Sequence, residues 1–110
     1  LILVTDGAGK INYYGINDVG EIIPPTVKAV DTTAGGDAFI GAFLFGLSQA
    51  DDTYMLLTKP SLYRSLITFA SACGAHAVIQ PGAFPALPTF SDVAIHWNSN
   101  ETFKEVNHAI

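Results

Sequence analysis

Two acidic residues flank a run of small residues in the segment DTTAGGDAFIGAFLFGL, which spans residues 31–47, and they could carry chemistry. Asp31 begins the segment, and Asp37 follows the small residues directly. Because residues 38–47 contain no polar side chain, we expect a loop that leads into a buried helix. The first N–H groups of a helix lack intrahelical acceptors and lie at the positive end of its dipole. A turn of small residues there predicts a site for an anion, most often phosphate.

Asp37 would lie beside that anion, where a carboxylate is a poor choice for binding alone because like charges repel. It makes chemical sense as a general base that takes a proton from a nucleophile attacking the phosphate. The structural alternative is that Asp37 is the N-cap of the helix, which is the usual role of Asp at such a position. The tripeptide Gly-Gly-Asp alone favours the structural alternative.

Composition limits the kinds of protein to which this chain can belong. The 110 residues are 49% hydrophobic and carry a net charge of −5, which suits one modest domain. With five Lys and Arg residues, nucleic acid is not an expected partner. No apolar run reaches membrane-spanning length, and we recognise no secretory signal. Cys73 is the single cysteine, so a reduced, cytoplasmic setting is expected.

The remaining segments predict an α/β fold. Residues 1–5 form an apolar run typical of a parallel strand buried on both faces. Gly and Pro positions and apolar spacing predict the other elements, which are a hairpin of Lys10–Tyr14 and Gly20–Ile23, a helix at Asp37–Leu47, a helical turn at Tyr54–Leu57, a helix at Leu62–His76 capped by Ser61, a loop at Val78–Pro88, and short helices at Asp92–Trp97 and Glu101–His108. The chain starts within a strand and is unusually apolar, so we expect it to be part of a longer enzyme.

The whole segment from residue 31 resembles the C-terminal signature of the ribokinase-like (PfkB) carbohydrate kinases. The match comprises the Asp-Thr opening, two small residues, Gly-Asp, and then Gly-Ala with apolar residues, with Ala34 where many members have Gly. The order of the segments is similar from about residue 1 to residue 88. The resemblance implies the C-terminal portion of a three-layer α/β/α fold, with residues 1–110 forming its ATP-binding and catalytic portion.

The resemblance implies transfer of the γ-phosphoryl group of MgATP to a sugar hydroxyl. Asp37 would be the general base, and the N–H groups of Ala34, Gly35 and Gly36 would hold the charge that develops on the transferring group. A short helix-start motif rarely carries chemistry by itself, but the length of this signature makes a chance match to a purely structural protein a remote alternative.

Three further positions match residues that contact the nucleotide in this family. Thr5 and Gly7, in Val-Thr-Asp-Gly, would lie beside the ATP phosphates or ribose together with Gly36, and Ser71 would line the adenine pocket. Two structural alternatives stay open. Gly7 would otherwise belong to a tight hairpin turn, and the small residues around Ser71 would otherwise allow close helix packing.

A monovalent cation site is also implied, with potassium as the expected ion. Its ligands would come from Asp31 and Thr33 and, as main-chain carbonyls, from Ala77, Gln80 and Gly82. Some members have a serine later in this loop, where this chain has Ala86. The structural alternative for Asp31 is an Asx-turn or a cap.

The Asp-Thr-Thr opening at residues 31–33 and the loop Gln-Pro-Gly-Ala-Phe-Pro-Ala-Leu-Pro at residues 80–88 are most similar to those of bacterial fructokinases. Fructose is therefore the expected acceptor, and ATP with Mg²⁺ the donor. Aminoimidazole riboside and ribose kinases are close alternatives, and nucleoside kinases are more distant. A nucleotide-binding module without catalysis is the alternative of a different class, against which the presence of Asp37 argues. We expect a homodimer, where one forms, to use parts of the enzyme outside this chain.

Overall fold

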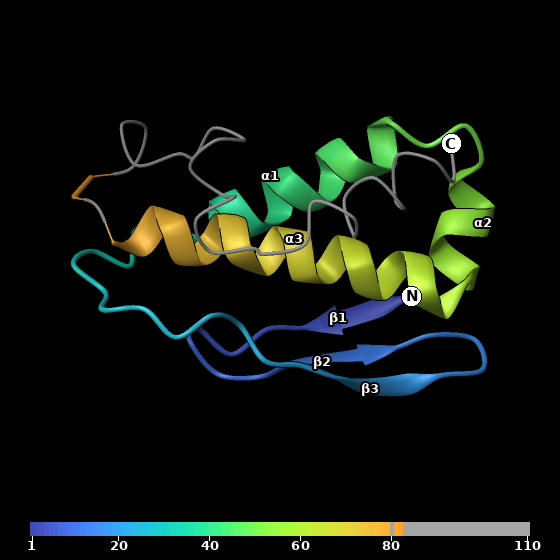
Figure 1. The fold of residues 1–110 in the computed structure, drawn as a ribbon, viewed down its shortest axis with the longest axis horizontal. Helices are drawn as coiled ribbons and strands as arrows, with labels where there is room; N and C mark the ends of the chain where they lie inside the picture. Colours follow the sequence, from blue (N-terminus) through green and yellow to red (C-terminus); the bar gives the residue numbers. More distant parts are fainter. Residues whose placement is uncertain (80, 83–110) are drawn as a thin grey trace.

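The computed structural model describes residues 1–79 and 81–82, and the fold below concerns these residues. Three strands come first, followed by three helices, and their bounds are β1 (Ile2–Val4), β2 (Ile11–Tyr14), β3 (Val19–Ile22), α1 (Gly35–Ser48), α2 (Thr53–Thr58) and α3 (Pro60–Val78). Figure 1 shows α3 lying between the sheet and α1, with α2 at one end of α3. The α/β prediction is confirmed.

The sheet is antiparallel throughout, in the order β1-β2-β3. The hairpin predicted for β2 and β3 is confirmed, and its turn is closed by a hydrogen bond from Gly15 N to Asp18 O at 2.7 Å. The prediction of a strand buried on both faces at residues 1–5 is wrong for the described residues. β1 pairs antiparallel with β2, and Ile2 and Val4 are 64% and 48% exposed. Alternate side chains of a strand face opposite sides, so only Leu3 of β1 packs against the core.

Helix α1 begins at Gly35, two residues before the predicted start. Its N-cap is Ala34, which makes no side-chain capping bond, so Asp37 lies inside the first turn. The N-cap alternative for Asp37 is therefore excluded. The apolar sequence of this helix predicts that it is buried on all sides, and that prediction is wrong for the described residues. Ile40 and Leu44 are 58% and 57% exposed.

Helix α3 also begins two residues before its prediction, at Pro60. Proline is favourable at the first helical position because its missing N–H would have no partner there, so Pro60 starts the helix rather than breaking it. Ser61 is consequently not the cap, and Lys59 occupies that position. Helix α2 extends the predicted helical turn, and the carboxylate of Asp52 caps it by accepting from Met55 N at 3.1 Å.

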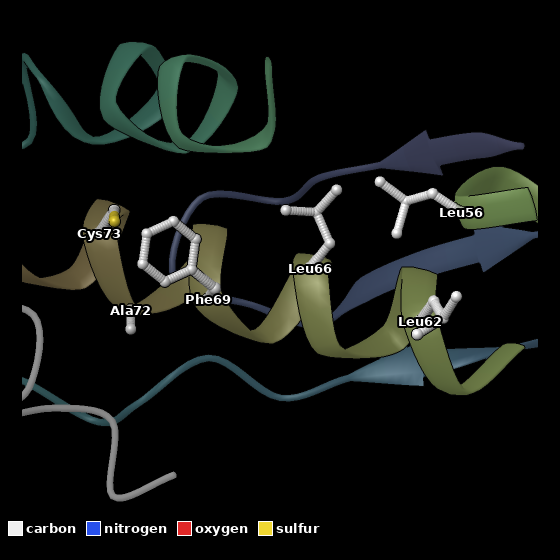
Figure 2. Close-up of a cluster of buried hydrophobic side chains, with 6 residues drawn as sticks. All are labelled: Leu56, Leu62, Leu66, Phe69, Ala72 and Cys73. Carbon is white, nitrogen blue, oxygen red and sulfur yellow. The ribbon is translucent and has the colours of Figure 1, made fainter. Parts of the chain in front are cut away.

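The predicted apolar stripe of α3 forms the larger part of the core between the helices. Figure 2 shows the six buried side chains of this core cluster, with Leu56 of α2 beside Leu66 of α3; its members are Leu56, Leu62, Leu66, Phe69, Ala72 and Cys73. Burial raises the pKa of Cys73 to about 12, so its thiol is not a nucleophile at neutral pH. A second core cluster joins the sheet to α3 through Ile11, Tyr13, Tyr63 and Ile67.

A polar network ties the hairpin turn to the start of α3. The carboxylate of Asp18 accepts hydrogen bonds from Tyr63 Oη at 2.8 Å and from Arg64 Nη2 at 2.7 Å, and Arg64 Nε donates to Tyr13 Oη at 2.5 Å. The Tyr63 hydroxyl, foremost, and Arg64 lower the pKa of Asp18, while burial raises the pKa of Tyr63 to about 12. The end of the molecule that carries this turn is therefore held by charge-assisted bonds.

The helices predicted beyond residue 88, and residues 83–88 of the preceding loop with Ala86, lie outside the described residues. Within the described part of the chain, no helix is both long and apolar enough to span a bilayer.

Gly46→Ala should destabilise the protein by about 1–3 kcal/mol, because a Cβ there would lie 2.1 Å from Leu66 Cδ1, and Leu66 is fully buried. Leu66→Ala alone should cost about 2–5 kcal/mol, mostly for the cavity it leaves. In the double variant the new methyl group partly fills that cavity, so the loss should be smaller than the sum of the two. Urea unfolding of the full-length gene product measures all three values, and strict additivity would contradict the proposed contact.

Candidate active site

The predicted site residues gather where the start of α1 meets the end of α3. The loop before α1 is fastened to the last turn of α3, since Val30 N and Asp31 N both donate to Val78 O, at 2.7 and 3.0 Å. Next to this anchor three small side chains form a buried cluster, Ala34, Ala38 and Ala77. Their size allows the loop and the two helices to lie close together. The backbone of residues 30–38 is therefore supported from behind by α3.

Asp31 bridges two loops that are far apart in the sequence. Its Oδ1 accepts from Thr33 N at 2.9 Å and from Thr33 Oγ1 at 2.5 Å, while its Oδ2 accepts from Gly82 N at 3.1 Å. The bond from the Thr33 hydroxyl, followed by those from the backbone N–H groups of Thr33 and Gly82, lowers the pKa of Asp31 below its ordinary value of 3.8. The carboxylate is thus ionised at neutral pH and connects the two loops.

The structure therefore brings together three of the five residues predicted for a cation site, Asp31, Thr33 and Gly82. Ala77 belongs to the cluster behind them, and Gln80 lies outside the described residues. The bond between Asp31 and Thr33 N has the geometry of an Asx-turn, the structural alternative for Asp31, but the bond to Gly82 goes beyond a local turn. The α1 cap is Ala34, so Asp31 is not a helix cap.

Gly82 adopts a backbone conformation that favours glycine, with a φ of 84°. A side chain at this position would strain the loop, which would weaken the approach of its N–H to Asp31. The described residues contain no group of three or more His, Cys, Asp or Glu side chains that could hold a metal ion together. The ligands expected at the cation site are mainly main-chain carbonyl oxygens, which belong to none of these side chains.

Asp37 and the predicted anion-binding backbone lie within one turn of α1. Asp37 is exposed in the first turn, and Gly36 beside it is also exposed, with no described atom within 4 Å of where a Cβ would be. Gly35 N makes only a long bond to Thr32 O, at 3.3 Å. A ligand can therefore approach the backbone at Gly36 closely, and the carboxylate of Asp37 emerges from the same turn. This open front contrasts with the buried side chain of Ala34 behind it.

Thr5 and Gly7 follow β1 and are both exposed. Gly7 has a φ of 51°, and the turn closes through a bond from Gly9 N to Asp6 O at 2.6 Å, so the tight-turn alternative describes the conformation correctly. In Figure 1 this turn, the start of α1 and the end of α3 lie at the same end of the molecule. A nucleotide contact at Thr5 and Gly7 fits that placement and stays a prediction.

Ser71 is buried in α3, and its Oγ donates to Thr68 O at 2.8 Å. One turn further on, Gly74 lies against the backbone of α1. Close helix packing therefore accounts for the small residues in this part of α3, and the role of Ser71 in an adenine pocket stays a prediction. His76, near the end of the same helix, is buried at 4% exposure.

Sequence analysis did not identify Val78 as part of the site. Val78 acts through its main-chain carbonyl, which every residue possesses, so its side chain gives no signal. Gly74 is one of the small residues around Ser71, for which an adenine pocket or close helix packing was expected, but its partner in α1 is known only from the folded structure.

Comparisons with known proteins agree with this geometry. The chain is 42% identical over 92 residues to a protein of Arabidopsis thaliana named probable fructokinase-5. The matched region covers 84% of this chain and 28% of that protein. It also resembles the crystal structure of a fructokinase from Xylella fastidiosa with bound ATP, with a TM-score of 0.77, 36% identity, and coverage of 94% of this chain and 31% of that one.

Two further solved structures contain ligands of interest. An aminoimidazole riboside kinase from Salmonella enterica, complexed with aminoimidazole riboside and an ATP analogue, matches with a TM-score of 0.75 and 34% identity over 86% of this chain and 30% of that one. A double mutant of the Vibrio cholerae fructokinase, with fructose, ADP and a potassium ion bound, matches with a TM-score of 0.73 and 32% identity over 86% of this chain and 29% of that one.

The chain spans less than a third of the length of each of these relatives. A family model described as pfkB family carbohydrate kinase matches residues 1–89, which include every described residue. The resemblance predicted from the signature is thereby confirmed, and the ribokinase-like fold with it. The chain belongs to the pfkB family of carbohydrate kinases.

Proposed function

We propose that this chain is the ATP-binding and catalytic portion of a kinase that phosphorylates a hydroxyl group of fructose. The observation that carries the proposal is the first turn of α1, in which the exposed carboxylate of Asp37 directly follows Gly36, an exposed glycine with free space in front of its backbone. Relatives named fructokinase in a plant and in two bacteria support fructose as the acceptor.

In this mechanism Asp37 accepts the proton of the attacking sugar hydroxyl. The hydroxyl oxygen forms a bond to the γ-phosphorus of ATP as the bond from phosphorus to the β–γ bridging oxygen breaks, and ADP leaves. Helix dipole and backbone N–H groups at Ala34, Gly35 and Gly36 stabilise the charge on the transferring group. Donors of this type are worth about 3–4 kcal/mol each in other enzymes. Mg²⁺ bound with ATP neutralises part of the phosphate charge.

We assign nucleotide binding to the end of the molecule where the start of α1 meets the end of α3. Thr5 and Gly7 would contact the phosphates or ribose from the β1–β2 turn, and Gly36 would contact the phosphates from α1. Ser71 is assigned to the adenine side, although its hydroxyl already donates within α3. The nucleotides present in three of the similar crystal structures support a nucleotide as the ligand.

A potassium ion would bind between the loops that Asp31 connects. The donor set suits this ion, since it consists of one carboxylate, at Asp31, and of oxygen atoms at Thr33, Ala77, Gln80 and Gly82. The potassium-bound fructokinase structure supports this ion. When bound, the ion would help order both loops beside the start of α1.

Aminoimidazole riboside is the second candidate acceptor, because the Salmonella kinase with that ligand is nearly as similar as the fructokinases. ADP release by the full-length gene product, with MgATP and a panel of fructose, ribose, aminoimidazole riboside and adenosine, separates the candidates. Strong preference for fructose would support the proposal, whereas preference for another acceptor would show that fructose is not the substrate. No ADP release with any acceptor would favour a nucleotide-binding module without catalysis.

The proposed cation site predicts that ADP release is faster in potassium than in tetramethylammonium. Equal rates in the two salts would contradict the proposed cation site.

Asp37→Asn should lower kcat by about 10²- to 10⁴-fold, because the amide cannot take the proton in the transition state. Binding of ATP should stay within about twofold of the unchanged protein, since the lost group acts chiefly during transfer. Initial rates and calorimetric titration with ATP measure the two effects. Asp51→Asn is the matched control, because it removes the same charge from an exposed position after α1 and should keep full activity. An Asp37→Asn enzyme with normal kcat would remove Asp37 as the base.

Asp31→Ala should destabilise the protein at neutral pH but not in acid. The lowered pKa of Asp31 means that its contribution is complete well above 3.8, the ordinary pKa that this carboxyl has in the unfolded chain, and is lost as the pH falls through the lower folded value. Urea unfolding between pH 7 and pH 2.5 should therefore show a constant difference from the unchanged protein down to about pH 4.5, and a shrinking difference below it.

The control for this experiment is Asp51→Ala, which removes an exposed carboxylate away from the two loops. A difference that stays constant to the lowest pH for Asp31→Ala would show that the carboxylate charge does not hold the loops together.

A further inference from the structure

The backbones of α1 and α3 lie close together at Gly35 and Gly74. A Cβ added to Gly74 would lie 3.0 Å from Gly35 O and 3.6 Å from Phe39 Cβ. A Cβ added to Gly35 would lie 2.7 Å from Val78 Cγ1 and 3.7 Å from Gly74 O. At this point no side chain separates the two helices, so the main chain of α3 directly limits where the first turn of α1 can lie.

The other glycines of these two helices differ. At Gly36 and Gly41 an added Cβ would meet no described atom within 4 Å. At Gly46, near the other end of α1, the contact is with the side-chain tip of Leu66. A side chain can change rotamer, whereas a backbone carbonyl in a helix cannot move without the turn that contains it. Among the described helical glycines, Gly74 is therefore the one at which an added methyl group would displace main-chain atoms of α1.

The last turn of α3 also fixes the chain just before α1. Val78 O accepts from Val30 N and Asp31 N, so the loop is attached at one side and Gly35 touches Gly74 at the other. Residues 30–35 are thus held at both ends by one short stretch of α3. The directions of the N–H groups and of Asp37 in the turn that follows depend on this support.

We propose that Gly74 is a positioning residue for phosphoryl transfer, a proposal that rests on the function proposed above for the first turn of α1. Its missing side chain lets Gly35 approach α3 and sets the turn that carries Asp37. A methyl group at residue 74 would require the carbonyl of Gly35 to move by a few tenths of an ångström. Catalysis by preorganised groups is sensitive to such shifts, since a displacement of about 1 Å can cost about 100-fold in rate.

The kinetic test compares Gly74→Ala with Gly46→Ala in the full-length gene product. Gly74→Ala should lower kcat about tenfold and leave KM for ATP and for the sugar within about twofold, because the lost alignment matters in the transition state. Gly46→Ala changes the same helix interface at its other end, so it should lose stability but keep kcat within about twofold. Equal losses of kcat in the two variants, or normal kcat in Gly74→Ala, would overturn the proposal.

A second measurement does not depend on activity. Amide hydrogen exchange in the peptide that spans residues 33–38 should become faster in Gly74→Ala and stay unchanged in Gly46→Ala. If the unchanged protein releases no ADP, the proposed function fails, and this exchange result alone decides whether Gly74 positions the turn. Unchanged exchange in Gly74→Ala would refute the positioning role.

The contact can also be tested from the side of α1, in case Gly74→Ala does not fold. An alanine at Gly35 would meet Val78 Cγ1, which is a removable group. Gly35→Ala should therefore speed exchange at residues 33–38, and Val78→Ala in the same chain should restore slow exchange. Absence of rescue in the double variant would show that this contact does not set the turn.

Discussion

The approach of α1 to α3 without an intervening side chain is the constraint on which the candidate site depends. The backbones at Gly35 and Gly74 lie close together. In the loop that precedes α1, the N–H groups of residues 30 and 31 both donate to the carbonyl of Val78. These contacts leave the first turn of α1 little freedom, because a packed interior cannot deform without moving several groups together. An anion site made of main-chain N–H groups needs such support, since a change of side-chain rotamer cannot alter the direction of a backbone N–H group.

The two faces of this turn have opposite requirements. Behind it, the side chains of Ala34, Ala38 and Ala77 exclude water and hold the chain close to α3. In front of it, Gly36 and Asp37 are exposed, so a ligand can reach the backbone and the carboxylate. Small residues serve both faces, but for different reasons: tight packing behind and close approach in front. The small residues of the run Ala-Gly-Gly at positions 34–36 therefore allow both tight packing against α3 and close approach of a ligand.

Residue types predicted the family and the presence of the elements better than they predicted the edges of the elements. The stripe containing Leu62, Leu66 and Phe69 gave α3 correctly, because burial of one helix face requires that spacing. Both helices begin two residues before their predicted starts, because the small residues at 34–36 are typical of a turn and Pro60 of a break, yet both kinds of residue are tolerated at a helix start. The apolar run at residues 1–5 predicted a strand but not its partner, because hydrophobicity does not record whether a neighbour is parallel or antiparallel.

What the sequence could not reveal are the interactions that use no distinctive side chain. The bond between Asp31 and Thr33 follows from their spacing, but the bond to Gly82 joins residues 51 positions apart and depends on the path of α3 between them. The same is true of the Val78 carbonyl. Helix α3 thus has two roles: its middle supplies apolar side chains to the core, and its last turn supplies bare main chain to the site. The signature residues near Asp37 are consequently only one part of the candidate site, and the other part is the main chain at the end of α3 that packs against them.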